Sequence, residues 1–78
     1  MENRLIDQEV DARGLACPIP ILRAKKALAN MESGQVLHVL ATDPSAIRDF
    51  QLFAQQTGNE LLEQQQNGSE YSIYLRRR

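Results

Sequence analysis

Apolar residues recur along this chain at spacings that switch between two residues and three or four. Residues 5–13 alternate loosely between apolar and charged side chains, which predicts a half-buried strand that ends at Gly14. From Pro18 to Met31 the apolar positions fall three or four residues apart, which predicts an amphipathic helix. The side chains expected on its buried face are Ile21, Ala24, Leu28 and Met31.

A nearly continuous apolar run, Val36–Ala41, predicts a central strand of a sheet. Asp43 follows it as the expected N-terminal cap of a second helix, with Pro44 at the first helical position. This helix is predicted to run to about Thr57, and Gly58 suits the positive φ of a helix C-terminal cap. Its core stripe is expected to consist of Ile47, Phe50, Phe53 and Ala54.

The last third of the chain is predicted to be a β-hairpin. Asn67-Gly68 is a strong two-residue turn signal, and counting back from it places Leu62 opposite Ile73. Apolar and polar side chains alternate along the final strand, so one of its faces is expected to be apolar and the other to face solvent. The residues expected on the apolar face are Tyr71, Ile73 and Leu75.

The predicted element order is βαβαββ, and the fold class is α/β (α+β). Right-handed crossovers would place two helices on one face of a four-stranded mixed sheet, which gives an open two-layer sandwich. The opposite sheet face, which carries Tyr74, is left exposed or available for association. A chain of 78 residues accommodates one compact domain, so residues 1–78 are expected to form a single domain.

Composition and charge limit the classes of binding partner and the cellular compartment that we expect for this protein. A formal net charge of −1 gives no global electrostatic reason to bind nucleic acid or membrane, and we expect neither as a direct partner. The segment Met1–Val10 has no apolar stretch of signal-peptide length. The single cysteine excludes an internal disulfide and any cysteine-only metal site. A small chain without such staples is expected in the reducing cytoplasm.

The most informative segment is Gly14-Leu15-Ala16-Cys17-Pro18-Ile19-Pro20. Prolines are tolerated in the first turn of a helix, so we expect Pro18 at the first helical position and Cys17 at the N-terminal cap. Because Pro20 has no N–H, the Ile19 amide is the expected donor to the cysteine sulfur. A helix N-terminus carries partial positive charge and stabilises anions, so the pKa of Cys17 is predicted to be lowered.

The chain lacks the usual partners for other kinds of cysteine chemistry. Acyl transfer normally needs a positioned base, and the sole histidine, His38, lies within the predicted central strand. A dithiol redox cycle needs a second cysteine. Attack on an activated sulfur donor needs neither, which favours sulfur relay with Cys17 as the nucleophile. Three other interpretations stay open: an apolar core filler, a helix cap in a non-catalytic regulatory or binding module, and a thiol redox sensor.

Several segments together match one known pattern. They are Asp11–Pro20, Thr42-Asp43-Pro44, Asp49 and Gly58, and they span nearly the whole chain. A Cys-Pro-x-Pro pattern alone is weak, but it is specific when it follows Asp-Ala-x-Gly-Leu early in a short βαβαββ chain. On these residues the chain resembles the TusA/SirA-like family of sulfur-carrier proteins.

The resemblance implies a persulfide on Cys17, loaded by a cysteine desulfurase or another sulfurtransferase and delivered to an acceptor protein. It implies no cofactor apart from this covalent persulfide, and no metal. Family members serve tRNA thiolation, molybdenum-cofactor metabolism or sulfur oxidation. Many have a polar or acidic residue where this chain has Ile19, which counts against tRNA thiolation and suits a different acceptor. The motif residues that would support Cys17 are Gly14, Pro18, Ile19 and Pro20.

Residues near Cys17 are candidates for contact with the partner proteins. The basic ones would dock to an acidic surface of the partner. Arg13 and Arg23 would also favour an anion at the sulfur. Leu22 and Ile19, where exposed, would be apolar anchors. Asp43 is expected mainly as a helix cap, whereas Asp49 is expected to be a solvated helix charge. The candidate contacts are Arg13, Leu22, Arg23, Lys25, Lys26 and Asp43.

Overall fold

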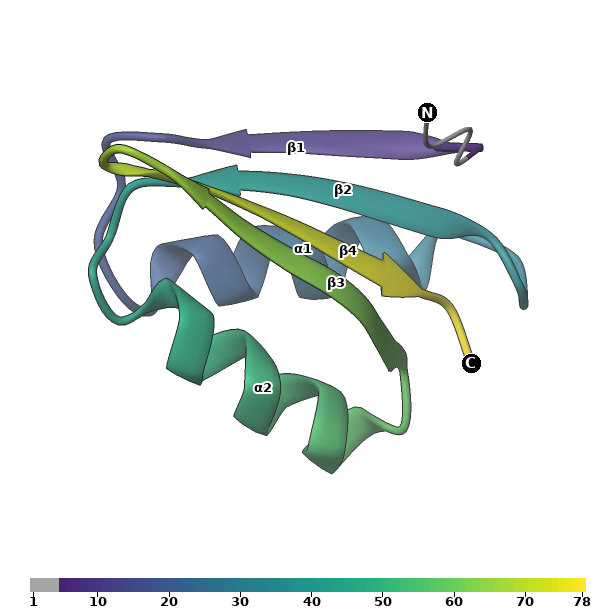
Figure 1. Ribbon diagram of the computed structural model, residues 1–78. Coiled ribbons are helices and arrows are strands. Elements are labelled where there is room, and N and C mark those ends of the chain that lie inside the picture. The colour runs from purple at the N-terminus through teal and green to yellow at the C-terminus, as the bar shows by residue number, and fades with distance from the viewer. Residues whose placement is uncertain (1–4) are drawn as a thin grey trace.

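The computed structural model describes residues 5–78 and has the predicted βαβαββ order. Helices α1 (Ile19–Ala29) and α2 (Ala46–Thr57) both cover one face of a four-stranded sheet (Figure 1). Its strand order is β1-β2-β4-β3, with β1 and β2 parallel and the other two pairings antiparallel. The predicted mixed two-layer sandwich is therefore confirmed. The strands are β1 (Gln8–Ala12), β2 (Val36–Ala41), β3 (Glu60–Asn67) and β4 (Glu70–Arg76).

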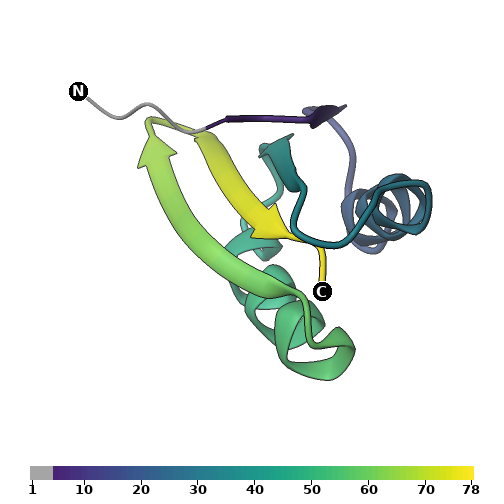
Figure 2. The same cartoon turned by 90° about the vertical axis from the view of Figure 1, so that its right-hand side faces the viewer.

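The hydrophobic core fills the space between the sheet and the two helices, which Figure 2 shows as separate layers. The predicted apolar faces of both helices contribute to it, and Phe50 and Phe53 meet edge to face at a centroid distance of 6.0 Å. Burial of such side chains is the main favourable term in folding, at about 1.5–3 kcal/mol each. The largest side chains with full burial are Phe50, Leu37, Ile73, Leu75 and Val39.

The sheet face away from the helices carries a row of polar and aromatic side chains across all four strands. In this row Glu9 pairs with His38, His38 with Tyr74, and Tyr74 with Glu63. The His38 ring stacks on Tyr74 with centroids 4.5 Å apart, and its Nδ1 lies 2.9 Å from Glu9 Oε2. His38 thus lies in a central strand, as predicted, and is packed there. Because it lies on the face opposite the helices, it is not a base for Cys17.

The predicted hairpin register is wrong by one residue on each strand. Asn67 pairs with Glu70, so the turn is Gly68-Ser69, and Ile73 faces Gln64 where Leu62 was expected. Gly68 has a φ of 65°, and no described residue other than glycine has a positive φ. A glycine at the first turn position followed by a residue with negative φ fits a type II′ turn.

The first strand and the first helix are shorter than predicted. The strand expected over residues 5–13 covers only Gln8–Ala12, and the side chains of Leu5 and Ile6 are 77% and 40% exposed. The helix expected over Pro18–Met31 covers Ile19–Ala29. The first four residues of the polar N-terminal segment lie outside the described residues. Neither helix within residues 5–78 is long and apolar enough to cross a membrane.

Candidate functional site

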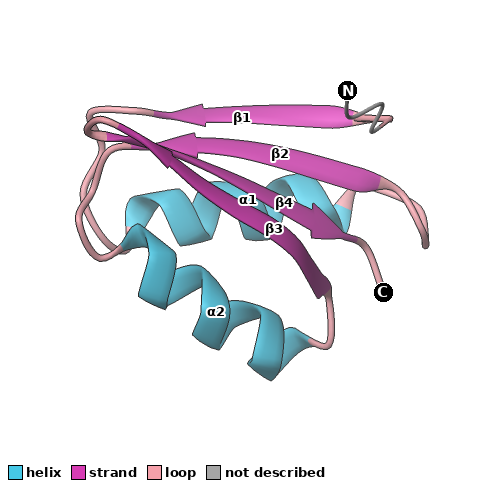
Figure 3. Ribbon diagram, in the orientation of Figure 1, coloured by secondary structure: helices cyan, strands magenta, loops and turns pink. Residues whose placement is uncertain are grey.

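The candidate site lies where the loops after β1 and β2 meet at one end of the sheet (Figure 3). Because β1 and β2 are parallel neighbours, their carboxyl ends fall at the same edge. Two hydrogen bonds join the loops: the Gly14 N–H donates to Thr42 Oγ1 at 2.8 Å, and the Cys17 N–H donates to Asp43 Oδ2 at 3.1 Å. Gly14 has a φ of 80°, which favours glycine at this bend.

The predicted cap of α1 is wrong by one residue. The Ile19 N–H donates to the Ala16 carbonyl at 2.9 Å, and the Leu22 N–H donates to the Pro18 carbonyl at 3.1 Å. Pro18 therefore accepts the first helical bond and is the N-cap residue, with no side-chain cap. Cys17 precedes the cap, and the amide that was expected to hold its sulfur is committed to a turn. The peptide bond between Cys17 and Pro18 is cis.

The predicted cap of α2 is also wrong. The Asp49 N–H donates to the Ser45 carbonyl at 2.9 Å, so Ser45 is the N-cap residue. The Asp43 carboxylate points to the other loop, where it accepts the Cys17 N–H, and it also accepts the Ser45 hydroxyl at 2.7 Å. The role of Asp43 in the fold is thus to hold the loop that carries Cys17. By contrast, Gly58 ends α2 with a φ of 81°, as predicted.

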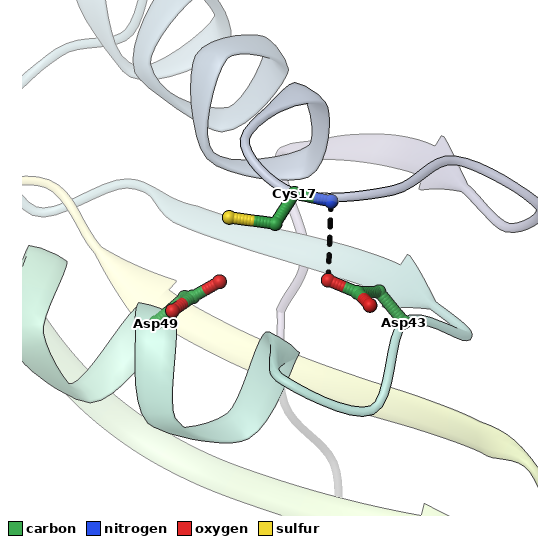
Figure 4. Close-up of side chains that lie close together, drawn as sticks. All are labelled: Cys17, Asp43 and Asp49. Atoms are coloured by element: carbon green, nitrogen blue, oxygen red, sulfur yellow. Dashed lines mark hydrogen bonds between the residues drawn. The ribbon is translucent and has the colours of Figure 1, made fainter.

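The side chain of Cys17 is exposed, so it is not a core filler. Figure 4 shows its sulfur directed toward the carboxylate of Asp49, which is on the first turn of α2. The sulfur and one carboxylate oxygen each of Asp43 and Asp49 all lie within 4.8 Å of one another. The sulfur therefore sits among acidic groups, on an accessible surface.

These acidic neighbours reverse the predicted electrostatics of Cys17. A hydrogen bond to the Asp49 carboxylate raises the pKa of the Cys17 thiol, and burial and the negative charges of Asp49 and Asp43 act in the same direction. The Ser45 hydroxyl opposes them with a smaller effect. The predicted lowering of this pKa was wrong because the sulfur faces the carboxylates near the start of α2, not the free amides of α1.

The basic residues predicted to stabilise an anion at Cys17 are engaged elsewhere. The Arg13 guanidinium forms an ion pair with Asp11 at 2.8 Å and a second with Glu70 at 3.6 Å. The pKa of Asp11 is lowered to about 2 by this arginine, chiefly through their side-chain hydrogen bonds. The charge of Arg13 is therefore balanced by Asp11 and Glu70, and not by an anion at Cys17.

The predicted basic stretch on α1 is divided between two grooves. Arg23 and Lys26 line an open groove against β1, together with Glu9 and Asp11. Lys25 lines another groove, together with residues of α2 and the arginines at the C-terminus. The three cations therefore do not form a single patch around Cys17.

Two predicted apolar contacts lie on the exposed first turn of α1. The side chains of Ile19 and Leu22 are 39% and 52% exposed, whereas Pro20 between them is buried. An exposed pair of large apolar side chains beside an exposed cysteine is suited to contact with another protein. Arg13, Arg23, Lys25 and Lys26 are also exposed, and Asp43 is half-buried.

Sequence reasoning missed Asp49 and Ser45 as neighbours of the sulfur. Ser45 and Asp49 are four residues apart and meet on the first turn of α2, where their side-chain oxygens are 3.1 Å apart. The i, i+4 spacing was a visible signal, but it could not indicate that this turn faces the other loop.

The group formed by Cys17, Asp43 and Asp49 has the types of donor atom that can bind a divalent cation. The positions of the two carboxylates are already accounted for by their hydrogen bonds, to the Cys17 amide and to the Ser45 hydroxyl.

Fold and site together define a class of protein: a small two-layer α/β domain that presents one exposed cysteine in the loop before its first helix. The family model described as Sulfurtransferase TusA matches residues 8–77, and the chain belongs to this family. The resemblance on the Cys-Pro-x-Pro segment is thereby confirmed at the level of the family.

Relatives match over nearly the whole chain. The sulfur carrier protein TusA of Allochromatium vinosum is 58% identical over 71 residues, which cover 91% of this chain and 93% of that protein. A putative sulfur carrier protein of Neisseria meningitidis serogroup B is 48% identical over 68 residues, covering 87% and 92%. The crystal structure of a SirA-like protein from Desulfitobacterium hafniense matches with a TM-score of 0.80 at 32% identity, covering 90% of this chain and 96% of that one.

Proposed function

We propose that this protein is a cytoplasmic sulfur carrier that holds sulfane sulfur as a persulfide on Cys17. It accepts the sulfur from a cysteine desulfurase or another sulfurtransferase and passes it to an acceptor protein. The observation that carries the proposal is the exposed sulfur of the only cysteine, in a family whose relatives are described as sulfur carriers. Ile19 and Leu22 form the apolar part of the surface that meets these partners.

The transfer is an exchange between a thiol and a persulfide. Cys17 Sγ attacks the outer sulfur of the donor persulfide, the S–S bond of the donor breaks, and a new S–S bond forms on Cys17. The donor leaves as a thiolate that takes up a proton, while the Cys17 thiol loses one. No oxidant or resident cofactor is needed, because the donor supplies sulfur that is already oxidised. Delivery to the acceptor repeats the exchange, and one Cys17 carries one sulfur atom at a time.

The two alternative functions receive less support. The regulatory module depended on Cys17 as a helix cap, but Pro18 is the N-cap residue of α1 and no side chain caps it. The thiol redox sensor has no support in the names of the relatives, which are described as sulfur carriers.

The proposal is tested by loading the protein with a cysteine desulfurase and L-cysteine. The intact mass of the wild type is expected to increase by one sulfur atom, and dithiothreitol is expected to remove the addition. Cys17→Ser is expected to gain nothing while keeping its circular dichroism spectrum, because the sulfur is exposed. A wild type that stays unmodified with several desulfurases and with inorganic polysulfide contradicts the proposal.

A further inference from the structure

We propose that Asp49 takes the proton of the Cys17 thiol while the sulfur attacks an incoming persulfide. This inference rests on the proposed carrier function and names the group that makes the first exchange possible. Asp49 is therefore a catalytic residue, because its carboxylate lies against the reacting sulfur (Figure 4).

The two carboxylates beside Cys17 have different surroundings. Asp43 Oδ2 already accepts the Cys17 N–H and lies 2.7 Å from the Ser45 hydroxyl. The Asp49 carboxylate instead faces the side chain of Cys17, with an oxygen within 4.8 Å of the sulfur, and its Oδ2 lies 3.1 Å from the Ser45 hydroxyl oxygen. Asp43 thus holds the backbone of the loop, and Asp49 is the carboxylate placed to receive the proton.

The Ser45 hydroxyl has a single proton and lies between these two carboxylates. It lies within hydrogen-bond distance of both, at 2.7 Å from Asp43 and 3.1 Å from Asp49, so the two carboxylates share one donor. Once Asp49 is protonated, its own O–H donates to Ser45 Oγ, and Asp43 then accepts the Ser45 proton alone. Ser45 Oγ therefore lies within reach of the Asp49 carboxyl oxygen that receives the proton.

The resting thiol needs such a base because its thiolate is scarce. Asp49 on α2 and Asp43 on the preceding loop are the charged groups that face the sulfur, and both raise the pKa of Cys17. On the Cys17 loop, Arg13 is paired with Asp11 and Glu70. A thiol is a poor nucleophile, so its proton must leave as the new bond forms. The Asp49 carboxylate, with an oxygen within 4.8 Å of the sulfur, provides the acceptor for that step.

The step balances in atoms and electrons. A lone pair of Cys17 Sγ forms the new S–S bond, and the Sγ–H bond breaks with its proton passing to Asp49. The S–S bond of the donor breaks, and its electron pair leaves on the inner sulfur of the donor. That thiolate takes up a proton from solvent, and Asp49 returns its own proton to solvent. The sulfur that moves keeps its oxidation state: Cys17 Sγ is formally oxidised and the inner sulfur of the donor is reduced by the same two electrons, so no external oxidant is needed.

Asp49→Asn separates this role from a simple charge effect, because the two roles predict opposite results. Removing the carboxylate lowers the pKa of Cys17, so the midpoint of the pH profile of alkylation by iodoacetamide is expected to move to lower pH in either case. If Asp49 is the proton acceptor, loading by inorganic polysulfide at pH 7 is expected to become about tenfold slower or more. If Asp49 only suppresses the thiolate, loading becomes faster in step with alkylation.

The pH profile gives a second readout that a structural role would not produce. Loading of Asp49→Asn depends on the thiolate, whereas loading of the wild type does not. The ratio of wild-type to variant loading rates is therefore expected to fall about tenfold for each pH unit between 6 and 8. Titration of the polysulfide affects both proteins equally and cancels in this ratio. A ratio that stays constant with pH overturns the inference.

Controls keep the test independent of folding and of partner docking. Glu32→Gln removes one exposed carboxylate at the other end of α1 and is expected to load like the wild type. Circular dichroism and thermal melting check that Asp49→Asn is folded. If it is not, the wild type is compared with N-acetylcysteine, and the ratio of their polysulfide reaction rates is expected to fall between pH 6 and 8. A constant ratio again overturns the inference.

The outcomes distinguish this inference from the function on which it rests. A wild type that loads together with an Asp49→Asn variant that loads equally fast or faster overturns only the role of Asp49. Slow loading of the variant by a desulfurase, but not by polysulfide, also overturns it, since Asp49 is then a partner contact. A wild type that accepts sulfur from neither donor overturns the carrier function itself.

Discussion

The loop after β1 and the loop after β2 have the same type of turn before their helices, but the first carries the cysteine and the second carries a carboxylate that binds the first. Each ends with a reverse turn closed by a backbone hydrogen bond of 2.9 Å, and the third residue of the turn accepts the first helical N–H. That residue is Pro18 in the first loop and Ser45 in the second. The second turn position, which faces outward, is Cys17 in one loop and Pro44 in the other.

The difference between the loops lies in where their side chains form bonds. The second loop directs the side chains of Thr42 and Asp43 to the backbone of the first, at Gly14 and at Cys17. The position of the first loop that corresponds to Asp43 is Ala16, which has no polar side chain. The loop with the nucleophile is therefore positioned by its neighbour, and substitutions in the second loop should change the behaviour of Cys17.

Asp43→Ala is expected to break this arrangement most strongly. It removes the acceptor of the Cys17 N–H and of the Ser45 hydroxyl, and it should lower the free energy of unfolding by about 2 kcal/mol in urea denaturation. Asp43→Asn keeps one acceptor oxygen and should recover about half of that loss. Equal losses in the two variants would show that the charge, and not the bond to the first loop, is what matters.

Thr42→Val is expected to have a smaller effect, since it removes one neutral hydrogen bond with little change in shape. The loss of the Gly14 N–H partner should cost about 1 kcal/mol of unfolding free energy and should speed hydrogen exchange at the Gly14 amide. Thr42→Ser retains the hydroxyl and serves as the matched control. Unchanged exchange at Gly14 in the valine variant would mean that the two loops are held by other contacts.

The smallest expected effect is a pH dependence of stability that comes from Cys17 itself. The folded protein raises the pKa of this thiol above its ordinary value of 9.0, so it keeps a proton that the unfolded chain releases. Stability from this source is complete below pH 9 and is lost as pH rises through the folded pKa. Urea denaturation at pH 7.5 and pH 10 should show the wild type losing stability relative to Cys17→Ser. A constant difference would mean that the thiol titrates normally.

The element order was predictable because each segment carries its own periodic signal. The run Val36–Ala41 forms a strand with the predicted bounds, and the predicted stripe on α2 faces the core, with Ile47 partly buried and its other three residues buried. Positions within one or two residues were not predictable. Proline suits both a turn and the first turn of a helix, so Pro18 and Pro44 could not indicate which backbone N–H begins the helical bonds.

The hairpin register illustrates the same limit at the far end of the chain. Asn67-Gly68 and Gly68-Ser69 are both acceptable turns on local grounds. The observed register leaves an irregularity between Leu61 and Glu63, so that Leu61 pairs with Leu75 and packs on the core. Gln64, which faces α2, donates from its side chain to the Ile47 carbonyl at 2.9 Å. The observed turn, Gly68-Ser69, is therefore the one whose register lets Leu61 and Gln64 of β3 pack against the core and α2.

By itself, the sequence determined the two-layer βαβαββ fold, the membership of the family and the cysteine on which the chemistry depends. Only the tertiary structure decided the charge that surrounds this cysteine. A sulfur at the start of a helix was expected among free amides, but the electrostatic potential at an atom comes from whatever lies nearest in space. Here those neighbours are Asp43 and Asp49, from a loop and a helix that follow 26 and 32 residues later in the chain.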